Sequence, residues 1–342
     1  MIKNFLLLIT VLFTVNGFAD LQKNRKSDHS NTIYSPTESY TILQELGEGA
    51  FGKVYAVENS AGKRYAIKTY KSHTDVQLAN HILANAQREY LRGQALNHSN
   101  IVKTFDLFEG SSRADKHATY LVLELVEGKT IFSIPKRSLE LNHALHSSVQ
   151  LIDALRYALS QNLFYLDLHA NNIMLANSFD TMIVDLASFY SIEELFNFAT
   201  QEEEEKEDKA KTVKDKKARA KHVMMKEKKL KRFFLNHPKL LKKFQNAKKK
   251  NKDHKTPKNK NADIDFEEPN QQQMMPLFSY YFDSITEICI QLILKSDLSR
   301  EEKLRLRSDI KMLAWNYSED IEDDLIVPID YYFEQLIEIL KS

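Results

Sequence analysis

The spacing of apolar positions along the chain changes once, near Gly128. Before that point, short or alternating apolar runs predict strands at residues 40–46, 53–57, 64–70, 101–109 and 119–125. Residues 76–96 repeat their apolar side chains at helical spacing, which predicts one helix within the series of strands. Beyond Gly128 helical spacing dominates, at residues 143–161, 285–294 and 329–340. The pattern predicts an α+β fold, with an antiparallel sheet and one helix followed by a mainly helical part.

The first 39 residues stand outside this pattern. Residues 1–19 combine Lys3, an apolar stretch and the small residues Gly17 and Ala19, which are the parts of a secretory signal peptide. We therefore expect export or secretion. The alternative is a membrane anchor formed by residues 5–19, although this stretch is shorter than the roughly 20 residues that span a bilayer. We expect no other segment to cross a membrane. Residues 20–39 are polar and aperiodic, which indicates a linker before a fold that begins near Tyr40.

A charged segment interrupts the second, helical part of the chain. Residues 200–263 alternate acidic and basic blocks with few large apolar side chains, which predicts a flexible insertion. Its lysines lie mainly within residues 206–260, so the formal net charge of +1 hides a strong local segregation. This segment allows electrostatic recruitment of an acidic partner, but no aromatic stacking pattern accompanies it, and we expect no specific nucleic-acid binding.

Overall composition limits the remaining classes. The 342 residues are 43% hydrophobic, enough for the core of one large or two modest domains. The single cysteine, Cys289, excludes an intrachain disulfide framework and lies in an apolar run, where we expect it to be buried.

Three of the eight glycines fall in one short run between two predicted strands. Glycine allows a hairpin to close over phosphate groups and to donate backbone N–H groups without a side chain in the way. A glycine-rich hairpin alone is often only a turn. Here the next predicted strand contains the sequence Tyr-Ala-Ile-Lys, whose lysine is Lys68. A lysine on the strand after a glycine-rich hairpin favours phosphate binding. The candidate residues of the run are Gly47, Glu48, Gly49, Ala50, Phe51, Gly52 and Val54.

A second group of polar residues lies in the later half of the chain. Asp167 is followed five positions later by Asn172, and Asp185 comes eighteen positions after Asp167 between apolar neighbours. One acidic residue in a loop is usually a cap or turn former. Phosphoryl transfer, however, needs a carboxylate that orients the acceptor hydroxyl and oxygen ligands for Mg²⁺, which these three side chains supply.

In this order, the motifs resemble those of the eukaryotic-type protein kinase superfamily. The resemblance implies a bilobal fold, with the N-lobe and hinge at residues 40–128 and the C-lobe at 129–342, and implies ATP and Mg²⁺ as cofactors. It implies that Lys68 holds the α- and β-phosphates and pairs with Glu89. Asp167 would be the catalytic base, with Asn172 and Asp185 as metal ligands. The adenine site would comprise the gatekeeper Leu123, backbone groups of Glu124 and Val126, and the side chains of Val54, Ala66 and Met174.

Several residues depart from the family's usual pattern. Leu166 stands where an arginine usually anchors a phosphorylated activation segment, so activation by loop phosphorylation is not expected. His169 replaces the usual lysine, and the resulting Asp-Leu-His pattern is similar to that of aminoglycoside and choline kinase relatives. Asp185-Leu186-Ala187 keeps the metal ligand but lacks the usual glycine. We also expect a later helix that begins at Asp283, in the position that braces the catalytic loop.

The sequence therefore favours a kinase that transfers the γ-phosphoryl group of ATP to protein hydroxyls, with Ser and Thr preferred. His169 keeps a small-molecule kinase open as an alternative. A pseudokinase that only binds a partner is the third reading, which the presence of Lys68, Asp167 and Asp185 disfavours.

Overall fold

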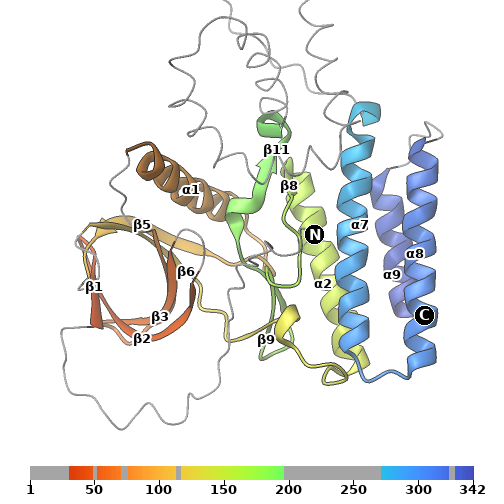
Figure 1. Cartoon of the computed structure of the whole chain (residues 1–342), viewed down its shortest axis with the longest axis horizontal. Helices are drawn as coiled ribbons and strands as arrows, with labels where there is room; N and C mark the ends of the chain where they lie inside the picture. Colours follow the sequence, from red (N-terminus) through yellow and green to blue (C-terminus); the bar gives the residue numbers. More distant parts are fainter. Residues whose placement is uncertain (1–30, 49–51, 71–75, 113–116, 196–270, 323–327) are drawn as a thin grey trace, which may run out of the picture. The chain divides into compact units, whose positions relative to one another are not determined.

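The structure is a computed structural model of the whole chain (Figure 1). It describes residues 31–48, 52–70, 76–112, 117–195, 271–322 and 328–342. Several predicted features lie outside these described residues, namely the signal peptide, most of the linker, the glycine-run residues Gly49, Ala50 and Phe51, and the charged insertion.

The chain divides into two compact units. Among the described residues, unit 1 comprises those within 1–154, 169–187 and 295–297, and unit 2 those within 155–168, 188–294 and 298–342. The division falls inside the helix α2 (Leu141–Ser160).

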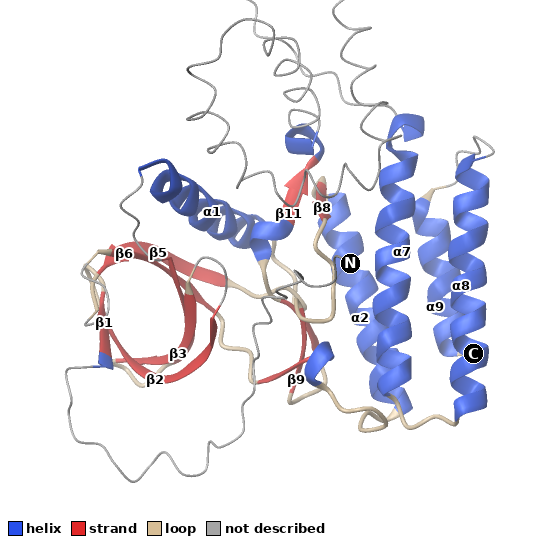
Figure 2. Cartoon of the chain, viewed as in Figure 1, coloured by secondary structure: helices blue, strands red, loops and turns tan. Residues whose placement is uncertain are grey.

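Unit 1 contains a six-stranded sheet in which every neighbouring pair of strands is antiparallel (Figure 2). Its order is β1-β2-β3-β4-β6-β5. The strands are β1 (Thr32–Tyr34), β2 (Ser39–Glu48), β3 (Lys53–Asn59), β4 (Arg64–Tyr70), β5 (Thr104–Gly110) and β6 (Ala118–Leu123). The helix α1 (Val76–Ala95) follows β4 in the chain. The predicted sheet with one inserted helix is thus confirmed.

The first strand of this sheet differs from the prediction. Residues 32–34 were assigned to the linker, but they pair with Ser39, Tyr40 and Thr41. The Ser35 side chain closes the intervening turn, because its Oγ donates to the Glu38 carbonyl and accepts from the Glu38 N–H. Ile33 is fully buried in the sheet's apolar cluster. The strand was missed because a single buried apolar side chain gives no periodic pattern.

The turn between β3 and β4 follows its sequence closely. The Asn59 side chain accepts hydrogen bonds from the N–H groups of Ala61 and Lys63, and Gly62 adopts a φ of 77°. Asparagine and glycine are the residues that such a turn requires. The turn fixes the register in which Val54 faces Lys68 and Ala56 faces Ala66.

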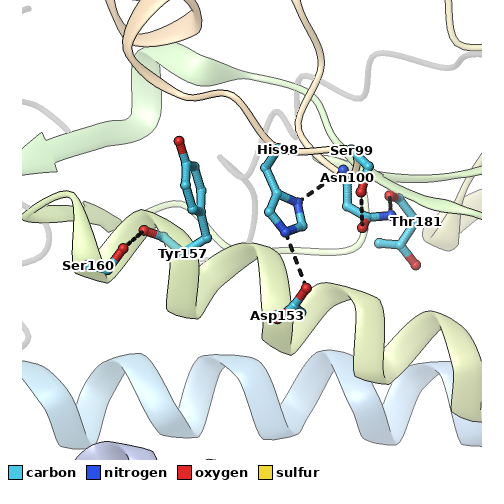
Figure 3. Close-up of polar contacts among 7 residues, drawn as sticks. All are labelled: His98, Ser99, Asn100, Asp153, Tyr157, Ser160 and Thr181. Carbon is cyan, nitrogen blue, oxygen red and sulfur yellow. Dashed lines mark hydrogen bonds and ion pairs between the residues drawn. The ribbon is translucent and has the colours of Figure 1, made fainter.

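The predicted strand at residues 101–109 begins three residues later than expected, at Thr104. Instead, Ile101 forms a bridge with Ile183, and the Val102 N–H donates to the Ile183 carbonyl at 3.0 Å. The preceding loop is held in the same way, since the Asn100 side-chain amide donates to the Thr181 carbonyl and His98 contacts Asp153 at 3.2 Å (Figure 3). These contacts tie the loop after α1 to a second sheet of unit 1 and to α2.

That second sheet has the order β10-β9-β7, with β7 (Gly128–Thr130), β9 (Ile173–Ala176) and β10 (Thr181–Ile183). β9 and β10 form a hairpin that packs along the first half of α2. Thr181 donates its N–H to the Gln150 side chain at 2.8 Å and its hydroxyl to the Ser147 carbonyl at 2.9 Å. The hairpin therefore has a firm support on one helix.

Unit 2 is mainly helical in its described residues. It contains the strand pair β8 (Leu163–Tyr165) and β11 (Phe189–Ser191), and most of α7 (Gln271–Lys295), α8 (Arg300–Glu322) and α9 (Ile329–Lys341). The core forms around Phe282 of α7, whose ring packs against those of Tyr317, Tyr332 and Phe333. Cys289 is buried on the same helix, as expected.

Three features of unit 2 differ from the prediction. Asp283 does not begin a helix, because α7 already starts at Gln271, and the residue is exposed. The helix α8 was not predicted, since its many charged residues conceal a buried face that includes Ile310 and Tyr317. The segment Leu277–Lys295 is long and apolar enough to cross a membrane, which was not anticipated; 56% of it is buried within the structure, as in a core helix.

Candidate active site

A partly buried ion pair forms the centre of the site in unit 1. Lys68 on β4 and Glu89 on α1 approach to 2.6 Å between Nζ and Oε2. Asp185, which follows β10, lies 3.8 Å from the same Lys68 Nζ. Glu89 is only 2% exposed, whereas a quarter of the Asp185 side chain is accessible. The structure thus brings together three of the predicted site residues from three separate parts of the sequence.

Electrostatics keep Lys68 charged. Burial alone would lower the pKa of its ammonium group, but the charges of Glu89 and Asp185 and the hydrogen bonds with them outweigh this effect. The pKa of Lys68 is therefore raised above its usual value. A phosphate group bound beside Lys68 would therefore meet a positive charge.

The two predicted metal ligands lie at the open end of the β9–β10 hairpin. Ile173 pairs with Ile183, so Asn172 and Val184 are the next residues on the two chains, and the Val184 N–H donates to the Asn172 carbonyl at 3.0 Å. Asp185 follows directly. An aspartate carboxylate and an asparagine amide oxygen are the hard oxygen ligands that Mg²⁺ prefers.

His169 belongs to the turn that leads into this hairpin. Its carbonyl accepts the Asn172 N–H at 2.9 Å, and its Nδ1 accepts the Asn171 N–H at 3.3 Å. An Nδ1 that accepts a hydrogen bond leaves Nε2 as the position for a ring proton in the neutral imidazole. The side chain helps to shape the turn whether or not it also contacts a substrate.

Asp167 belongs to unit 2 and lies two residues before His169 in the chain. The residue before it is held from two sides, because the Leu166 N–H donates to the Ser188 carbonyl at 3.1 Å and its carbonyl accepts the Tyr280 hydroxyl at 3.3 Å. The support that was expected from Asp283 on α7 thus comes from Tyr280, about one turn earlier on that helix.

The described part of the glycine run lies at the β2–β3 hairpin. Gly47 pairs with Val54, and Glu48 pairs with Lys53. Gly52 passes so close to β4 that an added Cβ would lie 1.6 Å from the Thr69 carbonyl oxygen. Position 52 therefore requires a glycine. Thr69, the residue that it approaches, is the neighbour of Lys68 on β4.

The predicted adenine-site residues are buried but not all are on one sheet. Val54, Ala66 and Leu123 are each 7–8% exposed in the six-stranded sheet, where Ala66 pairs with Leu123. Met174 lies in β9, in the three-stranded sheet. Strand β6 ends at Leu123, and the next residue, Glu124, turns back to Lys103 through its N–H at 2.9 Å. Val126 follows in the irregular segment before β7.

One residue of the site was missed by the sequence reasoning. The Tyr70 hydroxyl donates to Glu89 Oε2, the same oxygen that contacts Lys68. The available signal was the alternation of β4, since Lys68 and Tyr70 are two residues apart and share a face of the strand.

Residues 40–197 match the family model of the protein kinase domain. This stretch is similar to the protein kinase domain, and it contains every predicted site residue. The family implies the use of ATP.

Among curated proteins, the chain is 30% identical over 149 residues to the cAMP-dependent protein kinase type 3 of Saccharomyces cerevisiae. It is 31% identical over 151 residues to the serine/threonine-protein kinase PknA of Mycobacterium tuberculosis. Each match covers 43% of this chain, and 36% and 34% of the respective relatives. The chain thus spans about a third of the length of these relatives, and their whole activities do not transfer to it directly.

Proposed function

We propose that this protein is an ATP-dependent protein kinase that phosphorylates Ser or Thr hydroxyls. The observation that carries the proposal is the partly buried Lys68–Glu89 pair with Asp185 at 3.8 Å, within residues that match the protein kinase domain. The fold consistent with it is bilobal, with the sheet and α1 as the N-lobe, helices such as α2 and α7 in the C-lobe, and residues 200–263 as an insertion.

The residues of the site fit ATP and Mg²⁺. Lys68 offers a cation for phosphate oxygens, held by Glu89, and Gly52 keeps the adjacent hairpin free of a side chain at its closest approach to β4. Asn172 and Asp185 offer oxygen ligands, and the Asp185 side chain is accessible enough to reach a bound ion. Val54, Ala66, Leu123 and Met174 offer apolar side chains for the adenine ring.

When bound, Mg·ATP supplies the γ-phosphoryl group, and the metal neutralises part of the charge that develops on it. The chain's own residues position and polarise the phosphate and the acceptor hydroxyl. Lys68 binds phosphate oxygens, while Asp167 orients the acceptor hydroxyl and accepts its proton on a carboxylate oxygen. We propose that His169, two residues after Asp167, contacts the transferred phosphate.

We further propose export of the protein through residues 1–19, with anchoring by residues 5–19 as the alternative. Residues 206–260 would add electrostatic attraction for an acidic partner. Amino-terminal sequencing of the mature protein tests the first proposal, because an intact Met1 would contradict cleavage.

The central test is phosphoryl transfer from labelled ATP with Mg²⁺ and generic protein acceptors. We expect Asp167→Asn to lower transfer by about 100-fold or more, the usual effect of removing a catalytic acid–base group. Lys68→Met, which removes a cation that stabilises phosphate charge, should also lower transfer by about 100-fold or more. Lys63→Met is the matched control, because Lys63 is an exposed lysine in the β3–β4 turn and should leave transfer unchanged.

Each outcome has a distinct meaning. Labelling that needs both Lys68 and Asp167 supports the protein kinase. Binding of Mg·ATP without labelling of any protein would favour a small-molecule acceptor, in line with the Asp-Leu-His pattern at His169. Failure of the wild-type chain to bind Mg·ATP would contradict the proposal and leave a pseudokinase.

A further inference from the structure

Two polar side chains of β4 converge on one carboxylate oxygen. Lys68 and Tyr70 project from the same face of the strand, and both donate to Glu89 Oε2, Lys68 at 2.6 Å. The Tyr70 side chain is buried, with 2% of the residue exposed, as is Glu89 at 2%. The carboxylate therefore has little access to water and depends on these two donors.

Tyr70 also touches the other member of the pair. The Lys68 Nζ lies 5.4 Å from the centroid of the Tyr70 ring, a distance at which a cation is attracted to the ring face. The phenol thus contacts the carboxylate through its hydroxyl and the ammonium through its ring. Tyr70 therefore differs from a core tyrosine whose hydroxyl has no polar partner, where phenylalanine could replace it without loss of an interaction.

The hydroxyl keeps its proton under all ordinary conditions. Burial raises the pKa of Tyr70 well above its usual value, and the charge of Glu89 raises it further. Tyr70 is therefore held in its protonated, hydrogen-bond-donating form beside Glu89.

We propose that Tyr70 is a positioning residue that holds Glu89 on α1 in place and, through it, keeps Lys68 aligned for nucleotide. This inference rests on the proposed kinase function and concerns how its site is kept assembled. The contacts of Tyr70 with Lys68 and Glu89, which we call the clamp, lie entirely within unit 1. They involve residues of β4 and α1 only. It offers a way to maintain the Lys68–Glu89 pair without phosphorylation elsewhere, which suits a chain with Leu166 where an arginine anchor is usual.

The test is Tyr70→Phe in the full chain, which keeps the ring and removes the hydroxyl. We expect the affinity for Mg·ATP and kcat/KM for ATP to fall about tenfold, equivalent to about 1.4 kcal/mol. The matched control is Tyr40→Phe, because Tyr40 is a largely buried tyrosine of the same sheet whose hydroxyl bonds to another carboxylate, Glu38. This variant should lose stability without losing nucleotide affinity.

A double-mutant cycle separates positioning from general stability. If the hydroxyl acts through Glu89, Tyr70→Phe should change Mg·ATP affinity by less than about twofold when Glu89→Gln is already present. An undiminished effect in that background, or equal effects of Tyr70→Phe and Tyr40→Phe on affinity, would overturn the proposal. So would a Tyr70→Phe variant with wild-type affinity.

The wild-type chain distinguishes this inference from the function on which it rests. If it binds Mg·ATP and transfers phosphate while Tyr70→Phe behaves identically, only the clamp is refuted. If it binds no nucleotide, the proposed function fails first and the clamp with it.

Discussion

At the scale of single residues, Gly52 shows how closely the site is built. The Lys53 N–H donates to Thr69 Oγ1 at 3.0 Å, and the same oxygen donates to the Lys53 carbonyl at 3.1 Å. These bonds draw the β2–β3 hairpin onto β4 next to Lys68. Glycine at position 52, the last of the run, is therefore required by close packing against β4 as well as for access to phosphates.

Gly52→Ala should lower the free energy of unfolding by about 1–3 kcal/mol, the usual cost of overpacking, and should weaken Mg·ATP binding because Thr69 adjoins Lys68. Urea unfolding and a nucleotide titration measure the two effects. Gly62→Ala is the control. Its φ of 77° costs about 1–2 kcal/mol for an alanine, but no atom lies within 4 Å of the new Cβ. Equal ATP affinity of the two variants would contradict the steric argument.

The sequence could predict some of these contacts and not others. The order of motifs predicted the pairing of Lys68 with Glu89, which the 2.6 Å contact reproduces, although their catalytic roles stay predictions. The part played by Tyr70 depends on the exact rotation of α1 over β4, because only that rotation decides whether its hydroxyl meets Glu89. Periodicity alone carries no such information.

At the scale of elements, α2 supports the hairpin that carries the predicted metal ligands. Gln150 of α2 donates to Asp180 at 2.8 Å and accepts from the N–H of Thr181 at 2.8 Å. Ser147 accepts the Thr181 hydroxyl through its carbonyl and donates to the Phe179 carbonyl. The far end of the β9–β10 hairpin is thereby fixed, which steadies Asn172 and Asp185 at its open end.

Gln150→Ala should lower the free energy of unfolding by about 1–3 kcal/mol near neutral pH, because it leaves the N–H of the buried Thr181 without its acceptor. The variant should also raise the pKa of Asp180, which the Ser178 hydroxyl and the Gln150 amide hold below its usual value. NMR titration of Asp180 and urea unfolding at two pH values measure both effects.

The sign of the pH dependence follows from the lowered pKa. Asp180 contributes stability above its unfolded-state pKa and loses it as the pH falls through the folded-state pKa. The difference between wild type and Gln150→Ala should therefore shrink in acid. Ser178→Ala is the control, because it shifts the pKa of Asp180 but leaves Thr181 paired. A constant difference at all pH values would contradict this assignment.

Periodicity succeeded for elements with one clean apolar stripe. The helix predicted at residues 76–96 is α1 at Val76–Ala95, and that predicted at 329–340 is α9 at Ile329–Lys341. It failed for α8, where exposed Leu304, Met312 and Trp315 spread apolar side chains around the helix. It also failed for short strands such as β8, whose three residues are too few to establish a period.

At the scale of the whole molecule, the proposed roles divide between the two units. Lys68, Glu89, Asn172 and Asp185 belong to unit 1, whereas Asp167 belongs to unit 2. Unit 2 has its own aromatic core around Phe282, which is fully buried. Nucleotide binding and phosphoryl transfer should therefore respond differently to damage in that core.

Phe282→Ala removes a fully buried ring and should destabilise unit 2 by about 3–5 kcal/mol. We expect transfer to fall strongly, while Mg·ATP affinity at low temperature stays within about twofold of wild type. Phe108→Ala, in the apolar cluster of the six-stranded sheet, is the matched variant and should reduce both. A parallel loss of binding and transfer in Phe282→Ala would show that the units do not behave separately.

This division has a consequence for the discovery of inhibitors. If the proposed roles hold, a screen that scores displacement of a fluorescent nucleotide should report on unit 1, and it should overlook compounds that act around Tyr280 and Leu166, where a hydrogen bond supports the residue before Asp167. A screen that scores product formation would detect both kinds of compound. Hits found only by the second screen should be non-competitive with ATP, which would separate compounds that act on unit 2 from those that act on unit 1.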